Sequence, residues 1–154
     1  GDLVGAPADE IEAFGDALAK LQDTFDVVYN ANRAEIRATA AALADAPEDD
    51  AACLAALREA TGVTATVIHA ADVAMAATPG GVVSVESVGV AEPARHTGGG
   101  DHFTGGLTFA LAAGWDWDLA LACGNACAAG YVDTATTGSL DDVRAVAERA
   151  AGAD

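Results

Sequence analysis

Basic residues are scarce in this sequence. It contains seven lysines and arginines against 24 acidic residues, Lys20 is the only lysine, and the formal net charge is -17. Nucleic acids and anionic membranes attract proteins chiefly through lysine and arginine, so neither is an expected partner. Because 52% of the residues are hydrophobic, disorder is a poor explanation for the acidic surplus. Adaptation to a halophilic cytoplasm explains it better.

Cysteines and long apolar runs are scarce as well. The three cysteines, Cys53, Cys123 and Cys127, give an odd number without Cys-x-x-Cys spacing, which predicts reduced thiols. Cys123 and Cys127 could share a metal ion, but no His or third Cys lies nearby, so we expect small buried apolar residues. There is no apolar run of about 18 residues and no charged segment before an apolar one at the start. We therefore expect a soluble, untargeted, cytoplasmic protein.

The length and the hydrophobic patterns predict one domain, residues 1–154, in which helices and strands alternate. Such alternation is typical of an α/β fold with a largely parallel sheet flanked by helices. A hairpin is expected around Pro79-Gly80-Gly81. The expected strands are Asp26–Tyr29, Val63–His69, Val73–Ala77 and Val82–Val85. The expected helices are Pro7–Leu21, Arg33–Leu43, Asp50–Ala60, Phe103–Ala113, Trp117–Tyr131 and Leu140–Ala150.

The segment from His96 to Gly106 carries the clearest chemical pattern. Gly98, Gly99, Gly100 and Asp101 come immediately before an apolar-periodic helix. Glycines let several backbone N–H groups converge, and the positive end of the helix dipole favours an anion at that point. Phosphoryl transfer needs fixed donors of this kind, and Asp101 could accept the proton of an attacking hydroxyl. Alternatively, the glycines form a flexible loop and Asp101 is a plain N-cap.

This segment resembles the second signature of the PfkB (ribokinase-like) carbohydrate kinases, Thr-Gly-Ala-Gly-Asp-x-Phe. The matching residues are Thr97, Gly98, Gly100, Asp101 and Phe103. The resemblance implies an ATP-dependent kinase that transfers the γ-phosphoryl group to a hydroxyl of a sugar or related small molecule. It also implies an anion hole at Gly98, Gly99 and Gly100, Asp101 as the catalytic base, and Thr97 at the nucleotide.

Two further segments carry the same resemblance. Asn32-Arg33-Ala34-Glu35 resembles the family's Asn-x-x-Glu motif, which implies that Asn32 and Glu35 help to hold Mg²⁺, water and phosphate oxygens. An amide and a carboxylate suit a hard cation that keeps much of its water shell. Alternatively, these two residues form a capping box at a helix start. Asn125 stands where the family commonly has an Asn beside the adenine, although it could equally be a polar group that packs a helix.

The chain also departs from the family pattern. His69-Ala70-Ala71 replaces the Thr-x-Gly element at the nucleotide phosphates, and Ala74 replaces another glycine. Arg95 stands in place of an acid and could meet a phosphate instead. His96 and His102 flank the acid-containing turn, where an imidazole could bond the substrate or face solvent.

The resemblance covers only the C-terminal half of such kinases. It therefore implies a chain without the N-terminal strands and the lid, completed by a missing N-terminal segment or by a homo-oligomeric partner. A non-catalytic nucleotide-binding or structural module of the same fold is the alternative function.

Overall fold

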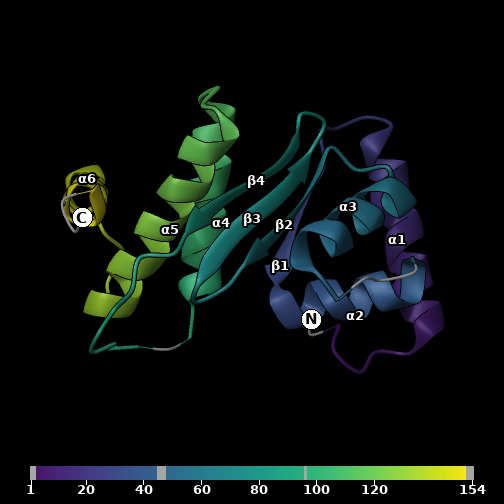
Figure 1. Ribbon diagram of the computed structural model, residues 1–154, viewed down its shortest axis with the longest axis horizontal. Coiled ribbons are helices and arrows are strands. Elements are labelled where there is room, and N and C mark those ends of the chain that lie inside the picture. Colours follow the sequence, from purple (N-terminus) through teal and green to yellow (C-terminus); the bar gives the residue numbers. More distant parts are fainter. Residues whose placement is uncertain (1–2, 45–47, 96, 152–154) are drawn as a thin grey trace. The chain divides into compact units, whose positions relative to one another are not determined.

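The computed structural model describes residues 3–44, 48–95 and 97–151 (Figure 1). Helices and strands alternate as the sequence predicts, and the four strands form one sheet in the order β1-β2-β3-β4. The strands are β1 (Val28–Asn32), β2 (Ala65–His69), β3 (Val73–Thr78) and β4 (Gly81–Glu86). The helices are α1 (Ala8–Gln22), α2 (Arg33–Leu43), α3 (Asp50–Thr61), α4 (Gly99–Ala112), α5 (Trp117–Thr134) and α6 (Leu140–Ala151).

The chain divides into two compact units. Unit 1 takes the chain as far as His69 together with Met75–Val83, and unit 2 takes Ala70–Ala74 together with the chain from Ser84 onward. A single domain over residues 1–154 therefore stays a prediction. Within the described residues, no helix has both the length and the apolarity needed to cross a bilayer.

Unit 1 is built on a parallel pair of strands. β1 and β2 run parallel, with Val28 opposite Ala65 and Asn32 opposite His69, and the chain returns between them through α2 and α3. A parallel connection needs such a crossover because the second strand must start at the same end as the first. The crossover brings the carboxyl ends of both strands, and hence Asn32 and His69, to one edge of the sheet.

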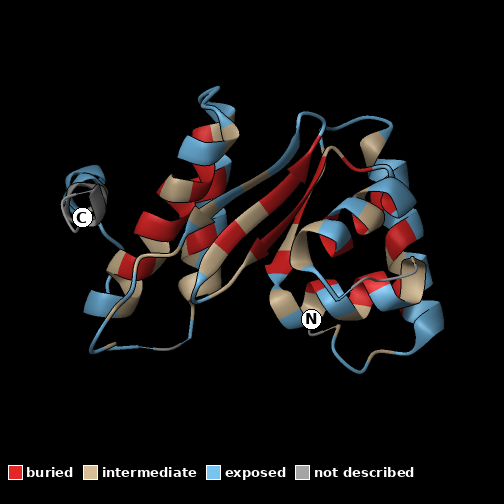
Figure 2. Cartoon of the chain, viewed as in Figure 1, coloured by how far each residue is buried: buried red, intermediate tan, exposed pale blue. Residues whose placement is uncertain are grey.

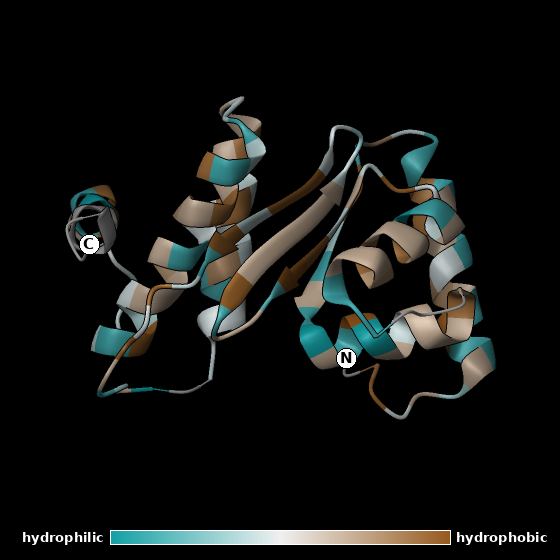
Figure 3. Cartoon of the chain, viewed as in Figure 1, coloured by the Kyte–Doolittle hydropathy of each residue, from teal (hydrophilic) through white to brown (hydrophobic). Residues whose placement is uncertain are grey.

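The helices of unit 1 are amphipathic and cover this strand pair. Figure 3 shows hydrophilic and hydrophobic residues alternating along α1 and α2, and Figure 2 shows buried residues along β2. β2 is buried at its first four positions, and Leu54 and Leu57 of α3 are fully buried. Gly62 ends α3 in the left-handed conformation with φ 69°, as expected for a glycine that terminates a helix. The helix therefore ends one residue beyond the expected range of Asp50–Ala60.

The expected hairpin is formed by β3 and β4. Two residues join these strands, and three join β2 to β3, so both connections are too short for a parallel crossover. The hydroxyl of Thr78 donates to the carbonyl of Gly81 and accepts from the N–H of Gly80, which closes the turn. The parallel pair is therefore β1 with β2. The chain then reverses its direction before β3 and again before β4.

Unit 2 is centred on a tight contact between α4 and α5. A Cβ atom at Gly106 would lie 2.9 Å from the carbonyl oxygen of Cys123, and one at Gly124 would lie 2.9 Å from the ring of Phe103. Phe103 is 1% exposed, so its ring fills the space left by Gly124. The small residues of these helices thus allow a close helix pair, which fixes the start of α4 against α5.

Most element boundaries differ from the sequence prediction by one to four residues, and two of these differences involve candidate site residues. β1 begins at Val28 and continues to Asn32, whereas a strand over Asp26–Tyr29 was expected. Helix α4 begins at Gly99 instead of Phe103, so Gly99 and Gly100 lie in its first turn and not in a preceding loop. Apolar periodicity begins only at Phe103, and two glycines add nothing to it.

Candidate active site

The glycine turn is shaped by one residue in the left-handed conformation. Gly98 is the N-cap of α4, with φ 96° and ψ -5°. A Cβ atom at this position would lie 2.9 Å from Cε1 of Tyr131 and 3.2 Å from its hydroxyl oxygen. Both the backbone angle and the contact therefore require glycine. The structure thus places Gly98 at the helix cap and Gly99 and Gly100 in the first turn of α4.

The first turn of α4 presents backbone donors and one carboxylate. Gly99, Gly100 and Asp101 are its first three residues, and N–H groups at such positions have no acceptor within the helix. They point out of the positive end of the helix dipole, which favours an anion. Asp101 is exposed and belongs to the same turn. It is the third helical residue, so it is not the N-cap of the helix.

His102 ties this turn to two other segments. Its Nδ1 lies 2.8 Å from the carbonyl oxygen of Gly98, and its Nε2 lies 3.0 Å from the hydroxyl of Thr137. Its ring stacks on Tyr131 with a centroid distance of 3.7 Å and an interplanar angle of 13°. The guanidinium carbon of Arg95 lies 5.8 Å from the centre of the Tyr131 ring. His96, the other histidine singled out in the sequence, lies outside the described residues.

A cavity of about 340 Å³ opens beside Asp101 within unit 2. Side chains of α4 and α5 form its walls, and the segment that leads into α6 closes it. Its lining is mostly apolar, with a few polar groups at Asp101, His102 and Asp142. The lining residues are Asp101, His102, Gly105, Gly106, Phe109, Cys123, Ala126, Cys127, Gly130, Thr137, Gly138, Ser139, Leu140, Asp142 and Val143.

Two thiols of the cavity hold their protons more tightly than a free cysteine does. Burial raises the pKa of Cys127 to about 11, and the neighbouring Cys123 contributes to that rise. Burial also raises the pKa of Cys123. A thiol must lose its proton to bind a metal, so raised pKa values oppose binding at neutral pH. In the described part of the chain, no group of three or more His, Cys, Asp and Glu residues could hold a metal ion.

Asn32 and Glu35 form a capping box in unit 1. The N–H of Glu35 donates to Oδ1 of Asn32 at 2.9 Å, and the N–H of Asn32 donates to Oε2 of Glu35 at 3.1 Å. This is the alternative that the sequence left open, and it accounts for the spacing of the two residues. Each oxygen of a carboxylate or an amide has two lone pairs, so the pair keeps acceptor capacity beyond the cap. A magnesium ion bound mainly through water fits this donor set.

Asn125 is used to pack α5. It is 6% exposed, its amide donates to the carbonyl of Glu86 at 3.2 Å, and its oxygen accepts from the hydroxyl of Ser87 at 3.3 Å. These bonds join α5 to the end of β4. They match the helix-packing role that the sequence allowed, and the adenine contact stays a prediction. Thr97 is exposed immediately before the glycine turn, and no contact of its side chain assigns it a role.

The family model for prokaryotic ketohexokinases matches residues 1–150, which is nearly the whole chain. The chain belongs to the prokaryotic ketohexokinase family. The resemblance to PfkB carbohydrate kinases is thereby confirmed. No curated protein sequence matches this ketohexokinase family member.

Solved structures show that this family member has a ribokinase-like fold. An Escherichia coli protein described as a ribokinase II, solved with ATP and Mg²⁺, is 24% identical with a TM-score of 0.69. That match covers 92% of this chain and 45% of the other. A Thermotoga maritima ribokinase is 18% identical, covering 84% and 44%, with a TM-score of 0.71. A Methanocaldococcus jannaschii nucleoside kinase is 17% identical, covering 96% and 46%, also with a TM-score of 0.71.

This chain therefore spans less than half the length of the solved kinases that it resembles. The predicted α/β, ribokinase-like fold is confirmed, including the restriction to part of that fold. At these identities, the likeness concerns the fold, so the roles of individual residues remain proposals.

Tyr131 and the cavity beside Asp101 were not predicted from the sequence. Tyr131 is 33 positions after Gly98, and nothing in its local sequence marks it as the contact of that glycine. The cavity depends on how α4, α5 and the segment 137–143 pack, which no sequence period reports. The one available signal was Gly98 itself, because a glycine can mark a place where another residue comes close to the backbone.

Proposed function

We propose that this protein is the phosphate-handling part of an ATP-dependent kinase that phosphorylates a hydroxyl of a ketohexose or a related small molecule. The observation that carries the proposal is the start of α4. There, one left-handed glycine turn combines three helix-terminal amides with the carboxylate of Asp101. The family description, prokaryotic ketohexokinase, supports the class of acceptor.

In the proposed reaction, the acceptor hydroxyl attacks the γ-phosphorus of ATP. A P–O bond forms, the bond to the bridging β,γ-oxygen breaks, and ADP leaves. Asp101 accepts the proton of the hydroxyl as its oxygen attacks. The amides of Gly99, Gly100 and Asp101 donate to the oxygens of the transferred group, whose charge they stabilise without having to reorganise.

Charge compensation is a second requirement, because the chain carries a net charge of -17 and ATP is itself a polyanion. Helix-terminal amides are one source of positive potential. Arg95, which is exposed and lies beside Tyr131, is a candidate for a bidentate contact with a phosphate. We propose that Glu35 and Asn32 hold Mg²⁺, partly through water. We also propose that Thr97 and Asn125 contact the nucleotide. Bound to the phosphates, Mg²⁺ would neutralise their charge.

The direct test is to incubate the complete enzyme, in which the N-terminal segment or partner implied by the resemblance is present, with ATP and Mg²⁺ and a panel of acceptors, and to assay the 154-residue chain alone in parallel. The panel would contain ketohexoses, aldohexoses and nucleosides, with sugar phosphate and ADP quantified together. We expect the complete enzyme to form equal amounts of ADP and of a ketohexose phosphate, with much slower turnover of nucleosides, and the 154-residue chain alone to phosphorylate no acceptor. ATP that binds without any acceptor being phosphorylated would reject the proposal in favour of a non-catalytic module.

A further inference from the structure

The carbonyl oxygen of Gly98 accepts two hydrogen bonds from one residue. The backbone N–H of His102 donates to it at 3.2 Å, as the first bond of α4, and Nδ1 of the same residue lies 2.8 Å away. A carbonyl oxygen can only accept, so Nδ1 must carry a proton. His102 therefore holds the orientation of the Gly98 peptide through both its main chain and its side chain.

The second ring nitrogen is engaged too. In the neutral ring with Nδ1 protonated, Nε2 is an acceptor, and the hydroxyl of Thr137 at 3.0 Å is its donor. Thr137 belongs to the segment between α5 and α6. The imidazole of His102 thus connects the glycine turn to a segment 35 residues further along the chain.

Tyr131 supports the same turn from its open side. Its ring stacks on His102 at 3.7 Å, and its edge occupies the space where residue 98 would carry a Cβ atom. The N–H of Arg95 donates to the carbonyl of Val132 at 3.1 Å, so the segment that enters the glycine turn is also anchored to α5. The turn is therefore held by a hydrogen bond, a ring stack and a steric contact together.

We propose that His102 is a positioning residue for phosphoryl transfer: its Nδ1–H bond to Gly98 holds the glycine turn in the conformation that aims the first-turn amides at the transferred phosphate, while its stack on Tyr131 adds support that the turn does not require. This inference rests on the proposed function. His102 does not itself contact substrate in this scheme. It acts through Gly98, and only the bond from Nδ1 is essential to that action.

Two substitutions separate the bond from the stack. His102→Asn places an amide nitrogen where Nδ1 stands and so keeps the donor to Gly98, while it loses the ring. His102→Phe keeps an aromatic ring against Tyr131 but has no donor. The two variants should therefore diverge, with the asparagine variant close to wild type in the geometry of the turn.

The first measurement is independent of catalysis. Nitrogen-15 NMR of the protein should show a proton on Nδ1 of His102, and Gly98 Hα resonances shifted by the Tyr131 ring. The Gly98 shifts should persist in His102→Asn and move toward random-coil positions in His102→Phe. A proton on Nε2 alone, or equal loss of the Gly98 shifts in both variants, would overturn the proposal.

The second measurement is steady-state kinetics of the complete enzyme, wild type and variants, with MgATP and the best ketohexose acceptor. We expect kcat of His102→Phe to fall about 10-fold with less than about 3-fold change in the KM for ATP, and His102→Asn to keep kcat within about 3-fold. A purely structural role would lower the amount of folded protein in both variants without changing kcat per folded molecule. If the wild type phosphorylates no acceptor, the proposed function fails, and the NMR measurement still decides whether His102 holds the turn.

Discussion

Asp101 is exposed at the third position of α4, beside the cavity of unit 2. An amide has nearly the shape of a carboxylate but cannot accept the proton, so Asp101→Asn should lower kcat by about 10² to 10⁴-fold and leave the KM for ATP nearly unchanged. Coupled measurement of ADP formation at saturating acceptor would check this. Asp133→Asn, the same change at an exposed position near the end of α5, is the matched control. Wild-type turnover in Asp101→Asn would refute the assignment of the base.

Gly98 and Gly105 offer a matched pair of glycines on and near the glycine turn. Gly98→Ala meets both a φ of 96° and the Tyr131 ring, so it should lower the free energy of unfolding by about 1 to 3 kcal/mol. Gly105 lies inside α4, where a Cβ atom would have nothing within 4 Å, so Gly105→Ala should raise that free energy by about 0.5 to 1 kcal/mol. Urea denaturation of both variants gives the comparison. Equal effects of the two substitutions would show that the turn is not held as described.

Cys127 gives a pH dependence with a defined sign. Its pKa is raised from 9.0 to about 11 by burial and by Cys123. The folded state therefore holds this proton more tightly than the unfolded state, so stability is fully present below pH 9 and falls as the pH rises from 9 toward 11. At about pH 8, the folded protein should also react with thiol reagents about 100-fold more slowly at Cys127 than the urea-unfolded protein does.

Cys127→Ala separates this thiol from the other titrating groups. The variant should lose part of the decline in stability between pH 9 and 11, while Tyr29, Cys53 and Cys123, whose pKa values are also raised, keep the rest. An unchanged pH profile in the variant, together with fast labelling of native Cys127, would contradict the burial of this thiol.

At the scale of elements, the contact of α4 with α5 depends on Gly124. A Cβ atom there would lie 2.9 Å from the Phe103 ring and 3.1 Å from its carbonyl oxygen, and the latter belongs to the backbone and cannot swing away. Gly124→Ala should therefore destabilise the protein by about 1 to 3 kcal/mol, although alanine is the better helix former. Gly105→Ala serves again as the control, because it adds the same methyl group where space is open. A stabilised Gly124→Ala variant would contradict the close packing of these helices.

Most helices could be predicted because each carries its own signal. α2 spans Arg33–Leu43 as predicted, and α3 ends one residue after its predicted end at Ala60. The strand β1 was placed too early because its last residue, Asn32, is also the N-cap of α2, so one residue serves two elements. The local sequence pattern marks Asn32 as a helix cap, but it does not show that β1 continues up to that residue.

The candidate site could be predicted only where residues adjacent in sequence form it. Gly98, Gly99, Gly100 and Asp101 are adjacent in the chain, so the sequence already placed them together in one turn, although it placed the start of the helix at Phe103 instead of Gly99. The partners of that turn, Tyr131 and Thr137, come from α5 and the segment after it. Their positions follow from how α4 packs against α5, which depends on side-chain volumes across two helices and has no local signature.

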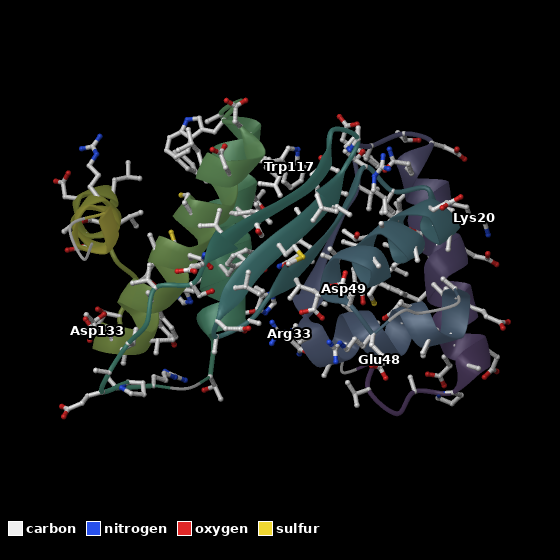
Figure 4. The ribbon with its side chains drawn as sticks, viewed as in Figure 1. Lys20, Arg33, Glu48, Asp49, Trp117 and Asp133 are labelled. Atoms are coloured by element: carbon white, nitrogen blue, oxygen red, sulfur yellow. The ribbon has the colours of Figure 1, made fainter. Side chains whose placement is uncertain are left out.

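At the scale of the whole molecule, the net charge of -17 predicts a dependence on salt. Exposed carboxylates repel one another over a Debye length of about 10 Å at ~0.1 M salt, which shortens to about 3 Å at ~1 M. Few cations offset these carboxylates, since Lys20, labelled in Figure 4, is the only lysine of the chain. Asp133, also labelled there, is an exposed acid at the C-terminal end of α5, where the helix dipole disfavours a negative charge. The melting temperature should therefore rise steadily from dilute buffer to molar KCl.

A variant with fewer exposed acids tests whether repulsion is the cause. Glu12→Gln in α1 and Asp133→Asn in α5 each remove one exposed charge, and Glu12 also lies four residues before Asp16 on the same helix, an unfavourable spacing for like charges. The double variant should melt at a higher temperature than the wild type in dilute buffer and show a smaller increase with KCl. If both proteins gain the same number of degrees between dilute buffer and molar KCl, or if neither gains any, repulsion between carboxylates does not limit the stability of this chain.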